Sequence, residues 1–407
     1  MKTLPTHRPV SAAHRMVVSL GVLFAMGAMA ISQAETRSEA PSTTAAQKDS
    51  PKTDTTAASS EKDWPLYRAN ARADGVAAAR LPERLKLLWR TPLEAGPIEA
   101  TAVIVDGVIY VGSLDGGISA VNLSDGKVKW TFPSEIGFNA SCAVRNGLVY
   151  AGDADGVFYC IDAATGKEKW RHRSDAPIDN SANFYKDRVL VGSQDANLYC
   201  LDAKTGKHVW TYSAADQIRC SPTVIDKYCF LAGCDGNLHV VDLDTGEAAR
   251  KVEIDGPTGS TPAARDQAVY FGTENGTFFA IDWRNGDVLW KYRDPKSNVA
   301  FRSSAAVTPE MVIVGGRSKR VYGLAPKTGE PVWTFPARAR FDSSPVVVGD
   351  RAYIGCSDGR LYVLEVATGK KVGEYQLGGE VVASPAVIDN RLVIANDEGV
   401  LFCFGAK

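Results

Sequence analysis

Residues 153–170 read DADGVFYCIDAATGKEKW, and the same pattern recurs along the chain. The matching stretches are SLDGGISAVNLSDGKVKW at 113–130, SQDANLYCLDAKTGKHVW at 193–210, TENGTFFAIDWRNGDVLW at 273–290 and GRSKRVYGLAPKTGEPVW at 316–333. Self-similarity at a nearly fixed period indicates a repeat array that grows as one body. This overrides the two or three domains that a length of 407 residues would otherwise suggest.

Three columns of residues stay in phase through the repeat. The tryptophan column, with successive spacings of 41, 40, 40, 40, 40, 43 and 40 residues, holds Trp89, Trp130, Trp170, Trp210, Arg250, Trp290, Trp333 and Gly373. A hydroxyl column, 29 residues before the tryptophan position from the second onward, holds Thr101, Ser141, Ser181, Ser221, Thr261, Ser304 and Ser344, and Ser384 continues it. A glycine column, four residues before the same positions, holds Gly126, Gly166, Gly206, Gly246, Gly286, Gly329 and Gly369.

Each unit contains four short strands with alternating apolar residues. In the first unit we expect strands at 101–105, 108–111, 118–122 and 127–132, with turns at Asp106-Gly107 and Asp125-Gly126. Four strands in forty residues are typical of a propeller blade, whereas a helical repeat would show a period of 3.6 residues. The eight hydroxyl positions therefore predict an all-β, eight-bladed β-propeller with four antiparallel strands in each blade.

The two ends of the array predict how the ring closes. The last unit stops after a third strand at 400–404, so it lacks a fourth strand of its own. Residues 85–91, LKLLWRT, form a spare fourth strand that places Trp89 in the tryptophan column. We expect this N-terminal strand to complete the last blade, because closure removes exposed sheet edges.

The remaining N-terminal residues divide into three predicted segments. Residues 1–34 resemble a signal peptide, with basic residues before an apolar run at 16–30 and small-x-small cleavage sites at 32–34 and at 28–30. The alternative is an uncleaved anchor. Cleavage would remove three positive charges and change the formal net charge from −1 to −4. There is no cysteine near the cleavage site, so we do not expect a lipid anchor attached to cysteine. Residues 35–62 have the composition of a disordered linker, 63–84 form a leader, and 85–407 form the propeller.

The columns resemble the pyrroloquinoline-quinone (PQQ) repeat family, whose blade pattern is Ala-x-Asp-x-x-Thr-Gly-Lys-x-x-Trp. The second unit matches this pattern, with Cys in place of Ala, at Cys160, Asp162, Thr165, Gly166, Lys167 and Trp170. The family includes quinone dehydrogenases and the outer-membrane assembly factor BamB, and this chain looks like a BamB-like exported member. The resemblance implies that the column tryptophans dock against the next blade, namely Trp89, Trp130, Trp170, Trp210, Trp290 and Trp333.

The residues give little support to catalysis. Quinone dehydrogenases of the family carry adjacent cysteines, a calcium site and long insertions, whereas this sequence has no Cys-Cys, no Cys-x-x-Cys-His and short loops, so the residues do not support PQQ as a cofactor. The mature histidines, His172, His208 and His239, lack metal-ligand spacing. Cys160, Cys200 and Cys403 share a column of small residues, so we expect packing and no disulfide framework.

One sector departs from the repeat. The step from Trp290 to Ser304 is 14 residues, against 11 at the other steps between blades. Positive charges gather in loops that open on one face of this sector: Arg219, Lys296, Arg302, Arg317, Lys319, Arg320, Arg338 and Arg340. We interpret them as a rim that binds an anion or an acidic partner. The alternative is a solvated charged rim without a ligand.

These observations favour a non-enzymatic binding scaffold of the cell envelope. We expect an exported monomer in the periplasm or outside the cell, with a protein partner, no membrane span after cleavage, and peripheral contact with the outer membrane as one option. Nearly balanced charge gives no support to nucleic-acid binding. The alternatives are an oxidoreductase that depends on PQQ or another small molecule, and a polysaccharide-binding propeller that uses loop aromatics such as Tyr292 and Phe301.

Overall fold

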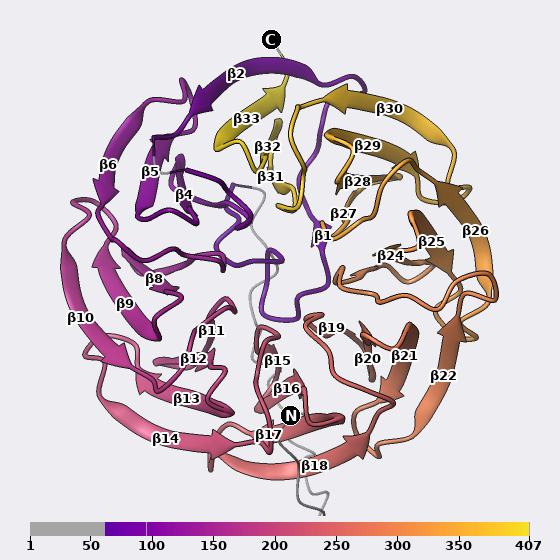
Figure 1. The fold of residues 1–407 in the computed structure, drawn as a ribbon, viewed down its shortest axis with the longest axis horizontal. Helices are drawn as coiled ribbons and strands as arrows, with labels where there is room; N and C mark the ends of the chain where they lie inside the picture. Colours follow the sequence, from indigo (N-terminus) through magenta and orange to yellow (C-terminus); the bar gives the residue numbers. More distant parts are fainter. Residues whose placement is uncertain (1–61, 95, 407) are drawn as a thin grey trace, which may run out of the picture. The chain divides into compact units, whose positions relative to one another are not determined.

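The computed structural model describes residues 62–94 and 96–406, which form an eight-bladed β-propeller (Figure 1). The all-β prediction is confirmed: there are eight blades of four antiparallel strands, and one of them gains a short parallel fifth strand. The predicted signal peptide at 1–34 and the predicted linker at 35–62, except its last residue, lie outside the described residues. In the described part of the chain, no helix is long and apolar enough to cross a membrane.

The first four blades follow one another in chain order. Blade 1 consists of β3 (Val103–Val105), β4 (Val108–Gly112), β5 (Ile118–Asn122) and β6 (Val128–Phe132). Blade 2 consists of β7 (Ala143–Arg145), β8 (Leu148–Gly152), β9 (Val157–Asp162) and β10 (Glu168–Arg173). Blade 3 consists of β11 (Asn183–Tyr185), β12 (Arg188–Gly192), β13 (Asn197–Asp202) and β14 (His208–Ser213). Blade 4 consists of β15 (Thr223–Ile225), β16 (Tyr228–Ala232), β17 (Asn237–Asp242) and β18 (Glu247–Glu253).

The other four blades complete the ring. Blade 5 consists of β19 (Ala263–Arg265), β20 (Ala268–Gly272), β21 (Thr277–Asp282) and β22 (Val288–Arg293). Blade 6 consists of β23 (Ala306–Val307), β24 (Val312–Gly316), β25 (Arg320–Leu324) and β26 (Pro331–Pro336). Blade 7 consists of β27 (Val346–Val348), β28 (Arg351–Cys356), β29 (Arg360–Glu365) and β30 (Lys371–Gln376), with β1 (Val76–Ala77) added in parallel. Blade 8 consists of β31 (Ala386–Ile388), β32 (Arg391–Ala395), β33 (Val400–Gly405) and β2 (Lys86–Pro92).

Local sequence explains both the hairpins and the burial. Asp106 and Gly107, at φ of 52° and 71°, both occupy the left-handed region that a two-residue hairpin turn requires. The second strand of blade 1 is buried along its whole length because neighbouring blades cover both of its faces. The fourth strand, by contrast, alternates between exposed and half-buried residues at the rim of the ring.

The N-terminal strand closes the ring, as predicted. β2 pairs antiparallel with β33, and Trp89 lies opposite Cys403 (Figure 1). At the inner end of the same junction, the backbone N–H of Ser384 donates to the hydroxyl of Thr101 at 3.0 Å. Blade 8 is therefore joined to blade 1 at both its inner and outer strands.

The hydroxyl column forms a girdle around the channel. At six junctions between blades, the backbone N–H of one column residue donates to the side-chain oxygen of the next, at 2.9–3.0 Å. These bonds link Thr101 to Ser141, Ser181 to Ser221, Ser221 to Thr261, Thr261 to Ser304, Ser304 to Ser344 and Ser344 to Ser384. Ser and Thr therefore recur because a buried N–H needs an acceptor from the adjacent blade.

The tryptophan and glycine columns meet between blades at the rim. Gly166 has a φ of 70°, and a Cβ built on it would lie 2.7 Å from Cδ2 of the Trp130 ring. The Trp130 indole N–H donates to the carbonyl of Ala163 in the next blade at 3.0 Å. The same packing recurs for Trp89, Trp170, Trp210, Trp290 and Trp333 on the following glycine. The constant spacing of the tryptophan and glycine columns therefore reflects a rigid contact between consecutive blades.

The leader makes a circuit inside the ring that the sequence did not reveal. Trp64 exchanges two backbone hydrogen bonds with Ile104 in blade 1, at 2.6 and 2.8 Å. Carbonyls of the leader then accept, in order, the backbone N–H groups of Val144, Val224, Ala264, Val307 and Val347, and Arg80 accepts that of Asn390 in blade 8. In blade 3 the side-chain amide of Asn183, rather than a backbone N–H, donates to the carbonyl of Ala71. Figure 1 shows this indigo segment looping within the ring before it reaches β1.

Candidate functional site

A funnel opens at the channel mouth on the face of the loops between blades. Its cavity volume is ≈ 510 Å³. One residue from each blade, always two positions before the hydroxyl column, contributes to its wall: Glu99, Asn139, Asp179, Arg219, Gly259, Arg302, Asp342 and Val382. Six hydroxyl-column residues line it at the next level down. The repeat therefore builds the funnel as two stacked rings.

Tyr67 of the leader forms the floor of the funnel. It lines the cavity, and its hydroxyl lies 2.9 Å from the hydroxyl of Ser344. Along each inner strand the wall residue comes first, the hydroxyl second and the leader contact third, as in Glu99, Thr101 and Ile104. The funnel is therefore closed below by the protein's own leader.

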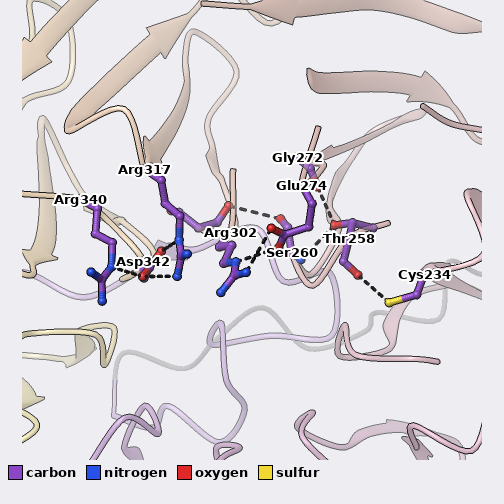
Figure 2. A network of polar contacts seen from close by, with 10 residues as sticks. Cys234, Thr258, Ser260, Gly272, Glu274, Arg302, Arg317, Arg340 and Asp342 are labelled. Carbon is purple, nitrogen blue, oxygen red and sulfur yellow. Dashed lines mark hydrogen bonds and ion pairs between the residues drawn. The ribbon is translucent and has the colours of Figure 1, made fainter. Parts of the chain in front are cut away.

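The predicted basic rim is largely neutralised by acidic residues. Figure 2 shows Arg302 paired with Glu274 at 2.7 Å and Asp342 held between Arg317 and Arg340, each at 2.8 Å. Arg340 also reaches Glu380 at 2.9 Å, and Arg320 reaches Asp294 at 3.3 Å. Arg219 donates to Gln217 at 2.9 Å. Within the described ranges, no ion pair was found for the other three rim cations, Lys296, Lys319 and Arg338.

Sequence reasoning missed the acidic partners, although they occupy repeat columns. Asp342 has the same place in its blade as Arg302 and Arg219 have in theirs, and Glu380 follows Arg340 by 40 residues. Burial favours the neutral form of Asp342, but hydrogen bonds from Arg317 and Arg340 outweigh it and hold the pKa of Asp342 below its ordinary value. The sector is therefore a belt of ion pairs between loops rather than a cluster of free cations.

This belt changes what a charge-removal experiment should show. Replacing Arg317, Lys319 and Arg320 together with Ser would leave Asp342 and Asp294 without these partners, and their side chains are only 10% and 8% exposed. Asp342 would keep only Arg340, and Asp294 would keep only hydrogen bonds such as that from Tyr322. Because losing one partner of a nearly buried carboxylate is costly, we expect a melting temperature several degrees below wild type. The matched control replaces the turn lysines Lys127, Lys167 and Lys207 with Ser. Equal melting temperatures for the two triple variants would contradict a structural belt.

The loop that enters blade 5 is fixed by its own polar contacts (Figure 2). The hydroxyl of Thr258 donates to the carbonyl of Gly272 at 2.5 Å, and that of Ser260 to Ser303 at 3.3 Å. Between them Gly259 offers no side chain, and a Cβ there would meet nothing within 4 Å. The wall therefore has a gap between Arg219 and Arg302, and the half-buried thiol of Cys234 lines the cavity nearby.

The remaining funnel charges are Glu99, Asp179 and Arg219. Asp179 accepts hydrogen bonds from the amides of Asn139 and Gln194. Burial raises the pKa of Glu99, as do the neighbouring carboxylates of Asp342, Asp397 and Glu380, while Arg340 acts against them. The funnel wall is therefore polar and mixed in sign.

The lining does not fit pyrroloquinoline quinone, the cofactor that the family resemblance raises. This quinone carries several carboxylates, so its site needs available cations. The funnel instead presents the acids Glu99, Asp179, Glu274 and Asp342 against two arginines, and Arg302 is already paired. Across the described residues, no three His, Cys, Asp or Glu side chains are arranged to hold a metal ion. The charges of the funnel lining therefore disfavour this quinone as a ligand there.

The histidines and cysteines lie in structural positions. His239 is buried between the hydroxyl of Tyr212 at 2.8 Å and the carboxylate of Asp235 at 3.0 Å. The equivalent residue in blade 3, Tyr199, donates to Asp195 in the same way, at 2.6 Å. All eight cysteines are free thiols. His239 therefore replaces a tyrosine that ties the blade's turn.

Stability should decrease below neutral pH because of this histidine. Burial lowers the pKa of His239 below its ordinary value and Lys251 adds to this, while Asp235 opposes both. Above about pH 6.5 the side chain is neutral in both states, but below it the unfolded chain binds a proton more readily than the native one. We expect the melting temperature to fall between pH 7 and 5.5, and to fall less in His239→Tyr. The exposed His208→Tyr is the control, and an equal pH dependence in both variants would refute this role.

A second cavity, of ≈ 630 Å³, lies at the turns of blades 2 and 3. Its lining combines turns between first and second strands, such as Asn146 and Gly147, with the turn residue Lys204. It also contains Lys169, which pairs with Asp162 at 3.0 Å. We regard the funnel as the better candidate because every blade contributes to it, and we keep the groove as a comparison site.

Comparisons with known proteins agree with this architecture. The chain is 20% identical to BamB from Moraxella catarrhalis, with a TM-score of 0.67 over 80% of this chain and 98% of that one. It is 17% identical to the quinohemoprotein alcohol dehydrogenase from Comamonas testosteroni, with a TM-score of 0.74 over 84% and 80% of the two chains. At these identities the likeness shows a shared fold.

A curated relative matches over a shorter stretch. Quinohemoprotein alcohol dehydrogenase ADH-IIG from Pseudomonas putida is 31% identical over 98 residues, which is 22% of this chain and 14% of the relative's length. The family model described as outer membrane protein assembly factor BamB matches residues 74–219, 194–340 and 335–407. These matches span the propeller from the end of the leader to the last strand, so the chain belongs to the BamB family of PQQ-repeat β-propellers.

Proposed function

We propose that this protein is a non-enzymatic scaffold of the cell envelope that binds a protein partner at the funnel. The observation that carries the proposal is the funnel wall, to which each of the eight blades contributes one residue at an equivalent position. Ion pairs such as Arg302 with Glu274 and Arg340 with Glu380 hold the loops in place. A preorganised wall loses little conformational entropy on binding, and its mixed charges favour specificity over unselective attraction.

Membership of the BamB family supports a protein partner in the envelope. We propose export by the segment at 1–34 and a location in the periplasm or outside the cell, with residues 35–62 as a spacer. The basic rim contributes to the binding face through Lys296, Lys319 and Arg338, three rim positions at which no ion pair was found among the described residues.

Site-specific photo-cross-linking in cells tests the proposal. A benzophenone amino acid at the exposed funnel residue Asn139 should give a discrete adduct with an envelope protein. The matched position is Lys204, in the groove of the other cavity. An adduct from Lys204 without one from Asn139 would move the site to that groove, and no adduct from any funnel-wall position would reject the scaffold role.

An oxidoreductase is the second candidate, because the match to the Pseudomonas putida dehydrogenase is 31% identical. Dye reduction with added PQQ, calcium and alcohols or sugars would detect such an activity. Polysaccharide binding was suggested by the loop aromatics Tyr292 and Phe301. Both are buried, at 9% and 3% exposure, so they cannot contact a ligand and do not support this alternative.

A further inference from the structure

Beside the floor residue Tyr67 lies a buried cation for which no ion pair was found among the described residues. Arg68 is 1% exposed, although it follows the floor residue Tyr67 in sequence. Its Nη2 donates to the carbonyls of Ala305, at 3.2 Å, and Pro345, at 2.5 Å. Its Nε and Nη1 have no hydrogen-bond partner among the described residues. A buried guanidinium with two unused donors is costly unless an anion or water reaches it.

The surroundings make room for this guanidinium. Gly75 has a φ of 66°, and a Cβ built on it would lie 1.9 Å from Nη2 of Arg68. Alanine at this position would therefore displace the head group. The chain thus keeps a glycine where the leader folds back over Arg68, which is a reason to regard the pocket as a formed cradle.

The cradle lies next to the funnel. Pro345, which accepts from Arg68, directly follows Ser344, whose hydroxyl contacts the hydroxyl of Tyr67. The Tyr67 ring also lies against the guanidinium, with 5.8 Å between Cζ of Arg68 and the ring centroid. The Tyr67 side chain, held by one hydroxyl contact, therefore lies against both the guanidinium and the cavity.

We propose that Arg68 is an anion-binding residue that takes a carboxylate group when the Tyr67 ring moves aside. The site rests on the proposed function only for the source of the ligand, which would be the C-terminal carboxylate or an acidic side chain of the partner. A carboxylate matches the planar guanidinium and its unused N–H donors, and it supplies the missing negative charge. Burial lowers the pKa of Arg68, with Tyr67 and Asp74 opposing it, which agrees with a cation short of compensation.

The first test uses the purified chain and sodium acetate, so it does not depend on any partner. Binding to the native state should raise the melting temperature by about 2 °C at ten times the dissociation constant. Tyr67→Ala should shift the response to lower acetate concentration, because it removes the cover. Arg68→Met, which replaces a buried charge with an apolar chain of similar length, should fold and show no acetate response beyond that of general salt.

Arg219→Met is the matched control, since Arg219 is an exposed arginine of the same funnel. It should keep the full acetate response. Loss of the response in Arg219→Met with retention in Arg68→Met would overturn the proposal, as would an equal response in all variants. If Arg68→Met does not fold, Tyr67→Ala decides the matter: an acetate response no stronger than wild type would overturn the buried site.

Peptides then distinguish the two sources of the carboxylate. Three acetylated Ser-Gly pentapeptides suffice: one with a free C-terminus, one amidated with a central Glu, and one amidated without an acid. A melting shift with either acidic peptide, absent in Arg68→Met, supports the site and names the source. Equal shifts with the neutral peptide would overturn it. Failure here leaves the cross-linking result untouched, so the site and the scaffold role are tested separately.

Discussion

Removing residues 63–93 is expected to abolish the folded propeller. This segment supplies β2, the outermost strand of blade 8, together with the leader that contacts the inner strands. Its loss would leave buried backbone N–H groups such as those of Val144, Val224 and Val307 without their acceptors. Each unsatisfied buried group costs roughly 1–3 kcal/mol, and only a few such losses would exceed the usual total stability of about 5–15 kcal/mol.

The measurement is the soluble yield and the circular-dichroism melting curve of the truncated chain. Removal of residues 35–61 is the comparison, because we expect that segment to act as a spacer with little effect on melting. A synthetic peptide of residues 63–93 added during refolding should restore a cooperative transition, which separates loss of the strand from general misfolding. A 63–93 deletion that melts within a few degrees of the 35–61 deletion would show that the ring closes without the leader.

The architecture was predictable because the contacts between blades of a propeller fall at the same positions in every repeat. A Trp that packs on a Gly of the next blade, and a hydroxyl that accepts a neighbouring N–H, must recur at the same place in every blade. Strand limits were therefore close: 85–91 was expected for the closing strand, and β2 runs from Lys86 to Pro92. The four predicted strands of blade 1 also agree with β3 to β6 to within two residues.

The site was less predictable because it depends on contacts that no single column shows. The arginines of one sector stood out by their charge, but their acids lie on different loops, as Glu274 does for Arg302 at a separation of 28 residues. The circuit of the leader has no repeat of its own, and its contacts are made by backbone carbonyls, which every sequence offers. The sequence did not mark Arg68 out from the rest of the leader, since its burial depends on Gly75 folding back onto it.

The second large effect should come from Gly329→Ala at the junction of blades 5 and 6. Gly329 has a φ of 72°, and a Cβ there would lie 2.4 Å from Cε3 of Trp290, a ring that is 8% exposed and cannot retreat easily. Its indole N–H is also held by the carbonyl of Pro326 at 2.8 Å. The substitution should therefore lower the free energy of unfolding in two ways. The left-handed backbone at alanine costs about 1–2 kcal/mol, and the overpacked contact costs about 1–3 kcal/mol.

The chain contains its own control one blade earlier. Gly286 has a φ of 87°, but its neighbour is Arg250, whose Cδ would lie 2.9 Å from the new Cβ and belongs to a flexible side chain. Gly286→Ala should therefore suffer the backbone cost without most of the overpacking. In urea unfolding, Gly329→Ala should be less stable than Gly286→Ala by about 1–3 kcal/mol, the usual range for overpacking.

A double-mutant cycle isolates the contact between the two columns. Arg250 donates to the carbonyl of Arg284 at 2.7 Å, as an indole would to the next blade, so an arginine can occupy the tryptophan position. Combining Trp290→Arg with Gly329→Ala should then recover part of the loss, because the arginine can yield where the indole cannot. Equal destabilisation by the two glycine substitutions, or strict additivity in the cycle, would mean that the tryptophan column is not what makes glycine necessary.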